Sequence, residues 1–162
     1  MLRDTETAAA LAKRHDQRLA GRAWTRTAAK RELRHAIDIR HTSFLDPAFV
    51  ALLRRHGMAL VFADSVAWPY TEDVTADFVY LRLHAPEELY ASGYSEEALE
   101  HWAARIKLWA RGLQPNDARL IPPALPPARR AARDVYVYFD NDTKVRAPAD
   151  ARTLRAKLRD RS

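Results

Sequence analysis

Apolar, β-rich runs that end in charged side chains recur along this chain. Runs that are apolar at nearly every position are typical of strands covered on both faces, as in parallel sheets. Folds built on parallel sheets hold their functional sites at the carboxyl ends of the strands. The pattern therefore predicts one parallel sheet with a polar site along one edge. We expect its strands at about residues 35–40, 58–63, 78–83 and 134–139.

Helical patterns alternate with these runs. We expect helices over residues 5–20, from Asp46-Pro47 to Gly57, from Ser95 to Gly112, and from Ala147-Pro148 onward. The connection at residues 65–76, after the second strand, is predicted to be a loop that replaces the expected crossover helix. Such alternation predicts right-handed crossovers and strands that lie in sequence order. The expected buried stripes are Ala8, Leu11, Ala12, His15 and Leu19; Phe49, Leu52 and Leu53; Leu99, Trp102, Ala103, Ile106 and Trp109; and Ala151, Leu154 and Leu158.

A segment rich in proline and arginine, residues 113–133, interrupts this alternation. Its five prolines predict an extended surface insert without regular secondary structure. Because it joins the end of a helix to the start of a strand, we expect it at the opposite end of the sheet from the polar site. The length of 162 residues predicts a single domain over 1–162.

Composition narrows the class of protein. The chain has no cysteine, which excludes disulfides and cysteine-ligated zinc. Neither a signal peptide nor an apolar run long enough to span a membrane is visible, so we expect a cytoplasmic, bacterial protein without membrane contact. The net charge of +6 is concentrated at both ends and in the insert, whereas the strand-bearing segments are acidic. A weaker possibility is nucleic-acid binding through Arg22, Arg26, Arg129, Arg130 and the helix at 152–161.

Side chains two positions apart on a strand share a face. Asp38 and Arg40 therefore point the same way, and so do Arg82 and His84. If all these faces line one interior, then the polar strand-end residues meet at one mouth. These residues are Asp38, Arg40, Asp64, Arg82, His84 and Asn141 or Asp142.

This set of side chains offers proton transfer and anion binding. We assign catalytic roles to Asp38, Asp64 and His84, and ligand-binding roles to Arg40, Arg82, Asn141 and Asp142. The alternative is that the Asp–Arg pairs only satisfy one another inside the fold. His41 could bind a metal, but its parity differs from that of Asp38, and any metal or cofactor remains unknown from the sequence. No glycine-rich phosphate loop, nucleophile elbow or His-Glu-x-x-His motif is present.

An ordered set of motifs resembles the YecE-like family, a domain of unknown function numbered seventy-two. The motifs are Asp38-Ile39-Arg40-His41, Asp64, Tyr80-Leu81-Arg82-Leu83-His84, Tyr94-Ser95 and Tyr138-Phe139-Asp140-Asn141-Asp142. The resemblance implies a TIM barrel, of which this chain corresponds to the C-terminal half. We therefore expect an incomplete, half-barrel α/β fold of about four parallel strands with outer helices. The family commonly has Glu where Asp38 stands and Gly where Ala85 stands.

Three functional hypotheses follow. The first is an enzyme-like pocket for a small anionic or sugar-like ligand, or a phosphodiester. The second is a non-catalytic, truncated protein that associates with itself or with another chain through its open sheet edges, because half a barrel leaves two edges and one strand face uncovered. The third, nucleic-acid binding, rests on the basic ends alone.

Overall fold

The computed structural model describes residues 3–85, 93–141 and 145–159. Contacts divide the chain into two compact units, Met1–His35 and Ala36–Ser162. The predicted strands and the later helices all belong to the second unit.

The first unit contains less helix than its sequence pattern predicts. Helix α1 spans Thr5–Ala12 and begins at Asp4, whose carboxylate accepts a hydrogen bond from the Thr7 amide. The helix expected to reach residue 20 is interrupted because Asp16 caps a separate 3₁₀ turn, η1, at Gln17–Leu19. Leu11 and Leu19 are each 51% exposed, so the predicted apolar stripe is not buried. A single short helix within the unit offers no second layer against which such a stripe could pack.

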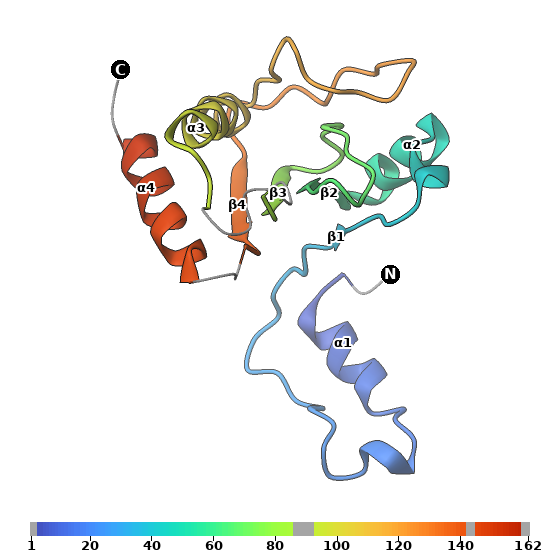
Figure 1. Ribbon diagram of the computed structural model, residues 1–162. Coiled ribbons are helices and arrows are strands. Elements are labelled where there is room, and N and C mark those ends of the chain that lie inside the picture. Colours follow the sequence, from blue (N-terminus) through green and yellow to red (C-terminus); the bar gives the residue numbers. More distant parts are fainter. Residues whose placement is uncertain (1–2, 86–92, 142–144, 160–162) are drawn as a thin grey trace. The chain divides into compact units, whose positions relative to one another are not determined.

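The second unit is built on the predicted parallel sheet (Figure 1). Its strands are β1 (Ala36–Ile37), β2 (Ala59–Asp64), β3 (Phe78–Leu83) and β4 (Asp134–Phe139), in the order β1-β2-β3-β4. All three pairings are parallel, which confirms the prediction. Strand β1 is shorter than expected, and the sheet is not closed.

Three helices of this unit match the predicted positions. They are α2 (Pro47–His56), α3 (Glu96–Ala110) and α4 (Ala147–Arg159), and a 3₁₀ turn, η2 (Thr42–Phe44), precedes α2. Asp46 and Ser95 cap α2 and α3 as N-caps, and Gly57 ends α2 in the left-handed conformation. All five predicted core residues of α3 are buried. Leu52 and Ala151 are exposed instead, and Val50 and Asp150 take the buried positions of α2 and α4.

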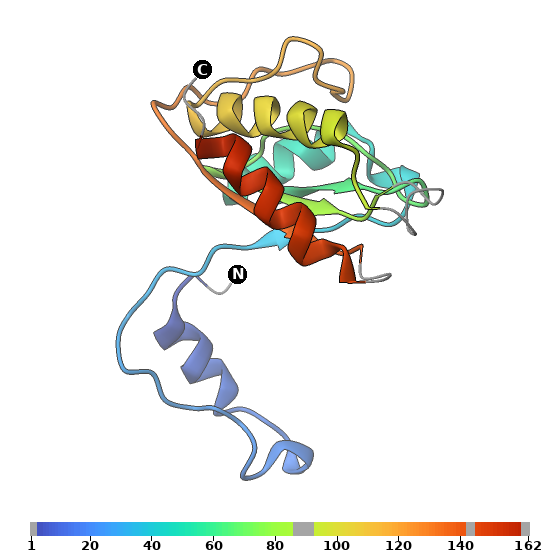
Figure 2. The same ribbon diagram turned by 60° about the vertical axis from the view of Figure 1, so that its left-hand side comes forward.

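Helices α2, α3 and α4 all lie on one face of the sheet of the second unit (Figure 2). Phe62, Leu81 and Leu83 pack there against α3 and α4, and Leu60 packs against Leu53 of α2. The alternate residues of β3 and β4 point to the opposite face, where Tyr136 and Tyr138 are 39% and 48% exposed. We call this the strand face; Tyr80 stacks on Tyr138 there, with ring centroids 4.9 Å apart.

The proline-rich segment has no regular secondary structure, as predicted, but it is not purely a surface excursion. The amides of Arg119 and Ile121 donate to the buried carboxylates of Glu72 and Asp73. Ile121 is itself buried. Two buried carboxylates therefore fix the middle of this segment onto the β2–β3 connection.

Candidate functional site

Arg82 of β3 is the centre of a polar network on the strand face. Its Nη1 donates to Asp38 Oδ2 at 2.6 Å, and its Nε donates to Asp140 Oδ2 at 2.7 Å. Asp38 follows β1 and Asp140 follows β4, so the guanidinium links the outer strands of the sheet across its middle. Both carboxylates raise the pKa of Arg82, and the hydrogen bond that Arg82 donates to Asp140 is the largest cause. Arg82 is therefore a permanently charged group that is already paired twice.

Arg40 extends this network towards solvent. Its Nη2 donates to Asp38 Oδ2 at 2.9 Å, and its guanidinium carbon lies 3.4 Å from the ring centroid of Trp68. Such a short cation–π contact holds the side chain in place and desolvates one face of the indole. The positive charge of Arg40 is thus shared between a carboxylate and an aromatic ring.

His84 lies directly after β3 and is 7% exposed. Its ring packs edge-on against Trp68, with centroids 4.6 Å apart, and its Nε2 lies 3.6 Å from Asp140 Oδ2. Burial lowers the pKa of His84 below its ordinary value, while the charge of Asp140 partly opposes that shift. A neutral imidazole beside a carboxylate is chemically suited to accept a proton or a hydrogen bond from a ligand.

We call Asp38, Arg40, Arg82, His84 and Asp140 the strand-face cluster. Two of its buried atoms, Asp38 Oδ1 and His84 Nε2, have no hydrogen-bond partner within the described part of the chain. The two carboxylates and two guanidiniums compensate one another in charge. The cluster therefore offers unused hydrogen-bonding capacity without a net charge.

The structure brings together four of the predicted site residues, Asp38, Arg40, Arg82 and His84. The structure does not bring Asp64 and Asn141 to this group. Asp64 lies opposite Leu83 in the β2–β3 register, and its carboxylate accepts a hydrogen bond from Tyr94 on the helix side of the sheet. Asn141 is buried and donates to Asp150 of α4. Residue parity orders side chains within one strand, but the register between strands sets which faces coincide.

Asp142 lies outside the described residues, so its predicted ligand-binding role stays a prediction. Asp140, two residues earlier, belongs to the strand-face cluster, although sequence analysis did not name it as a site residue. Asp140 is two residues beyond Tyr138, and parity therefore assigns it to the same face as Tyr136 and Tyr138. Trp68 gave no signal in the sequence because it lies in an irregular loop.

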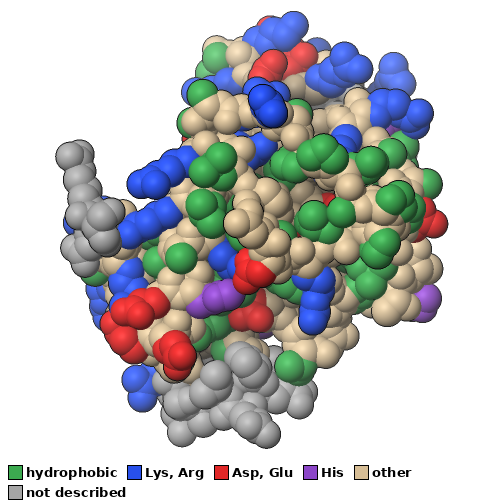
Figure 3. All heavy atoms as spheres, turned by 90° about the horizontal axis from the view of Figure 1, so that it is seen from above, with side chains coloured by type: hydrophobic (Ala, Val, Ile, Leu, Met, Phe, Trp, Pro, Cys, Tyr) green, Lys and Arg blue, Asp and Glu red, His purple; other side chains and the backbone are tan. Residues whose placement is uncertain are grey.

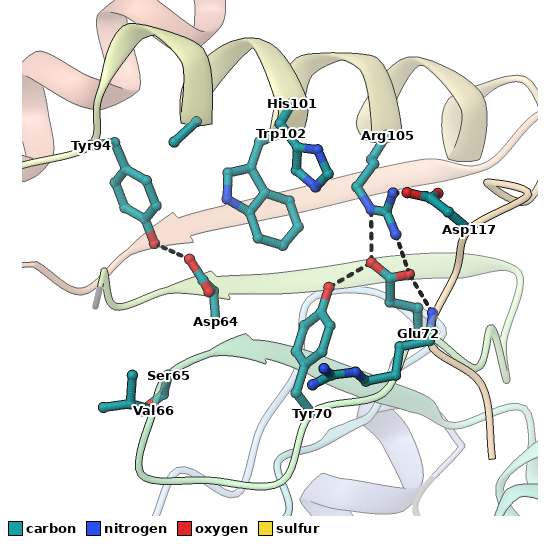
Figure 4. A pocket seen from close by; sticks show the side chains of 12 residues that line it. Asp64, Ser65, Val66, Tyr70, Glu72, Tyr94, His101, Trp102, Arg105 and Asp117 are labelled. Carbon is teal, nitrogen blue, oxygen red and sulfur yellow. Dashed lines mark hydrogen bonds and ion pairs between the residues drawn. The ribbon is translucent and has the colours of Figure 1, made fainter. Parts of the chain in front are cut away.

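Asp64 instead lines a separate cavity of about 490 Å³ between α3 and the β2–β3 connection (Figure 4). On its wall, Glu72 is fully buried and accepts from Arg105 Nε at 2.8 Å and from Nη2 at 2.6 Å. Arg105 also donates to Asp117 at 2.7 Å, and the Tyr70 hydroxyl donates to Glu72 at 2.5 Å. Sequence analysis missed Glu72 and Arg105, because one lies in a loop and the other lies beside the apolar stripe in the middle of α3.

His41, considered above as a metal ligand, caps the 3₁₀ turn η2 through its Nδ1, which lies 2.8 Å from Ser43 Oγ. Within residues 3–85, 93–141 and 145–159, no group of three or more His, Asp or Glu side chains is placed to hold a metal ion.

None of the helices described there combines the length and the apolarity needed to cross a membrane. On the face shown in Figure 3, Lys and Arg side chains gather at the top and along the left side, and hydrophobic side chains occupy much of the right side.

Comparison with known proteins indicates one family. The profile of "Protein of unknown function DUF72" matches residues 8–162. Among solved structures, a DUF72 family protein from Thermotoga maritima superposes with a TM-score of 0.61 at 23% identity, over 79% of this chain and 47% of that one. A DUF72 family protein from Enterococcus faecalis superposes with a TM-score of 0.58 at 17% identity, over 80% of this chain and 50% of that one. This chain thus spans about half the length of these solved relatives. No curated protein of known function matches it.

Proposed function

The chain belongs to the DUF72 family of proteins of unknown function, and we propose that its strand-face cluster binds a small, neutral, hydroxyl-rich molecule such as a sugar. The observation that carries the proposal is the pair of buried, unpartnered atoms Asp38 Oδ1 and His84 Nε2. Buried polar groups without partners are costly, and a ligand hydroxyl can satisfy either atom.

The charges of the cluster favour a neutral ligand over the anionic one that the sequence also suggested. Arg82 is paired with Asp38 and Asp140, and Arg40 is paired with Asp38 and covered by Trp68. An incoming phosphate would have to compete with carboxylates for both guanidiniums. A hydroxyl group needs only an acceptor, which Asp38 and neutral His84 supply.

His84 is the proposed proton acceptor if the bound molecule reacts. Its reduced pKa keeps the imidazole neutral, and the Asp140 carboxylate at 3.6 Å would stabilise the imidazolium formed by proton transfer. Asp38 would then orient a second hydroxyl. The predicted catalytic roles of Asp38 and His84 are retained in this proposal, whereas that of Asp64 is not, because Asp64 faces the other side of the sheet.

The proposal is tested by NMR titration of the protein with D-glucose, D-ribose and inorganic phosphate. We expect one of the sugars to shift the His84 ring signals at millimolar concentration, and we expect His84→Gln and Asp38→Asn to weaken binding about tenfold. The matched control is His56→Gln, since His56 is exposed at the end of α2. Tighter binding of phosphate than of both sugars, or unchanged binding by folded His84→Gln, would contradict the proposal.

A second candidate function is association with another polypeptide through the strand face. The exposed rings of Tyr136 and Tyr138 support it, because large aromatic side chains on an uncovered sheet face are typical of interfaces. The open edges of β1 and β4 offer further pairing positions. Light scattering of the purified chain tests this candidate. We expect the chain to form an oligomer, and we expect Tyr138→Lys to dissociate it. The control is Leu113→Lys, at an exposed position in the proline-rich segment, which should leave the oligomer intact. A stable monomer at micromolar concentration would contradict this candidate.

A further inference from the structure

The cavity beside α3 occupies a position that a crossover helix normally fills in parallel α/β folds. The connection from Asp64 to Phe78 contains no helix, and about 490 Å³ is left between this connection and α3. The cavity lies on the helix side of the sheet, away from the strand-face cluster. It is therefore a second site with its own chemistry.

Acidic charge exceeds basic charge on the wall of this cavity. Among the described residues, the lining includes three carboxylates, of Asp64, Glu72 and Asp117, and two guanidiniums, of Arg105 and Arg119, together with the imidazole of His101. Arg105 is paired with both Glu72 and Asp117. Asp64 is the remaining carboxylate, and among the described residues no cationic side chain forms an ion pair with it.

Among the described residues, a relay of neutral groups holds the Asp64 carboxylate in place. The Ala85 amide donates to the Tyr94 hydroxyl at 2.8 Å, and that hydroxyl donates to Asp64 Oδ2 at 2.6 Å. Burial raises the pKa of Tyr94, so the hydroxyl remains a donor. This relay positions the Asp64 carboxylate without neutralising its charge.

Aromatic rings line the same cavity as this carboxylate. Tyr70, Tyr94 and Trp102 line the cavity, and the side chains of Asp64, Tyr94 and Trp102 point toward one another (Figure 4). A carboxylate beside several aromatic rings is the arrangement that recognises organic ammonium groups, through charge attraction and cation–π contact. The Arg119 guanidinium carbon lies 5.9 Å from the Tyr70 ring centroid, at the outer limit of a cation–π contact.

We propose that this cavity binds a small molecule that carries a protonated amine, with Asp64 as its counter-ion. The ammonium group takes the unpaired charge of Asp64, and the apolar part of the ligand packs on Trp102 and Tyr94. Two kinds of compound present this group: a simple amine, and an amino acid whose carboxylate would pair with Arg119. Both share the chemistry that Asp64 recognises.

Calorimetric titration with three compounds of nearly equal shape tests the proposal: 2-phenylethylamine, 2-phenylethanol and L-phenylalanine. We expect the amine to bind at least about tenfold more tightly than the neutral alcohol. Asp64→Asn should reduce this preference about tenfold while preserving the acceptor for Tyr94. The control is Asp77→Asn, the same chemical change at an exposed position outside the cavity.

The amino acid distinguishes the two sources. If L-phenylalanine binds more tightly than the amine and Arg119→Gln removes this difference, the natural ligand is an amino acid. If L-phenylalanine binds equally or more weakly, the natural ligand is a simple amine. Equal affinity for the amine and the alcohol, or no binding of any of the three at about 10 mM, would overturn the proposal even if Asp64→Asn fails to fold. Unchanged amine binding by a folded Asp64→Asn protein would overturn it as well.

Discussion

Arg82 and Asp38 form an ion pair that crosses over a strand. Arg82 lies on β3, Asp38 follows β1, and the intervening strand β2 carries Ala63 opposite Arg82. The small, buried Ala63 side chain leaves room for the guanidinium to reach Asp38 Oδ2 at 2.6 Å. Because β1 pairs with β2 over only two residues, this ion pair is a major attachment of the edge strand.

A double-mutant cycle should detect this attachment. We expect a coupling free energy of about 1–2 kcal/mol between Arg82→Gln and Asp38→Asn in urea unfolding, because Arg82 is mostly shielded from solvent. The comparison is Arg40→Gln with Asp38→Asn, whose coupling should be smaller because the Arg40 side chain is 44% exposed. Equal coupling free energies for the two pairs would show that the burial of Arg82 does not strengthen its ion pair with Asp38.

The buried state of His84 predicts a pH dependence of stability. Burial lowers its folded pKa below the ordinary value of 6.5, so between these two values the unfolded chain binds more protons than the folded chain. Its contribution to stability is therefore intact above pH 6.5 and is lost as the pH falls through that range. In urea unfolding, His84→Gln should lose less stability than the wild type between about pH 7 and pH 5. An identical pH dependence in both proteins would contradict a lowered pKa.

Glu72 should be among the residues most important for stability. Its fully buried carboxylate holds Arg105 through two hydrogen bonds and also accepts from Tyr70 and the Arg119 amide. Glu72→Gln leaves a buried guanidinium with weaker partners and should cost about 3 kcal/mol of unfolding free energy. Asp117→Asn removes the exposed partner of the same arginine and should leave thermal stability nearly unchanged. A similar loss in both variants would contradict this assignment.

Ala85 occupies a backbone conformation that favours glycine. Its φ of 63° lies in the left-handed region, and the residue is fully buried. Ala85→Gly relieves about 1–2 kcal/mol of backbone strain but loses a methyl contact and some chain entropy, so we expect a net change below about 1 kcal/mol.

Ala103 provides the control for this substitution. It is equally buried but helical, and Ala103→Gly should cost about 2 kcal/mol from the lost methyl and the lower helix propensity. Chemical unfolding of both variants measures the difference. A comparable loss at the two positions would show that Ala85 is not strained.

Local patterns in the sequence determined most of the architecture. The runs at 78–83 and 134–139 form strands at the predicted residues, and Asp46 and Ser95 start helices as predicted. These features follow from interactions between residues close in sequence, such as a capping side chain and the next amides. The parallel order follows from the alternation of strands and helices, because connections between neighbouring strands are short and right-handed.

The composition of the candidate site depended on the tertiary structure. Parity correctly grouped Asp38 with Arg40 and Arg82 with His84, because the members of each pair lie two residues apart at the end of the same strand. It could not show that Asp64 faces the helices, since β2 pairs with β3 in a register that places Ala63, and not Asp64, beside Arg82.

Glu72 and Arg105 illustrate the same limit over a longer distance. They are 33 residues apart, in a loop and on a helix, and no local pattern links them. Only the packing of α3 against the β2–β3 connection brings them together. The sequence by itself therefore determined which residues form strands and helices and which side chains share a strand face. The tertiary structure decided which of those faces meet, because inter-strand register and long-range packing involve residues far apart in the chain.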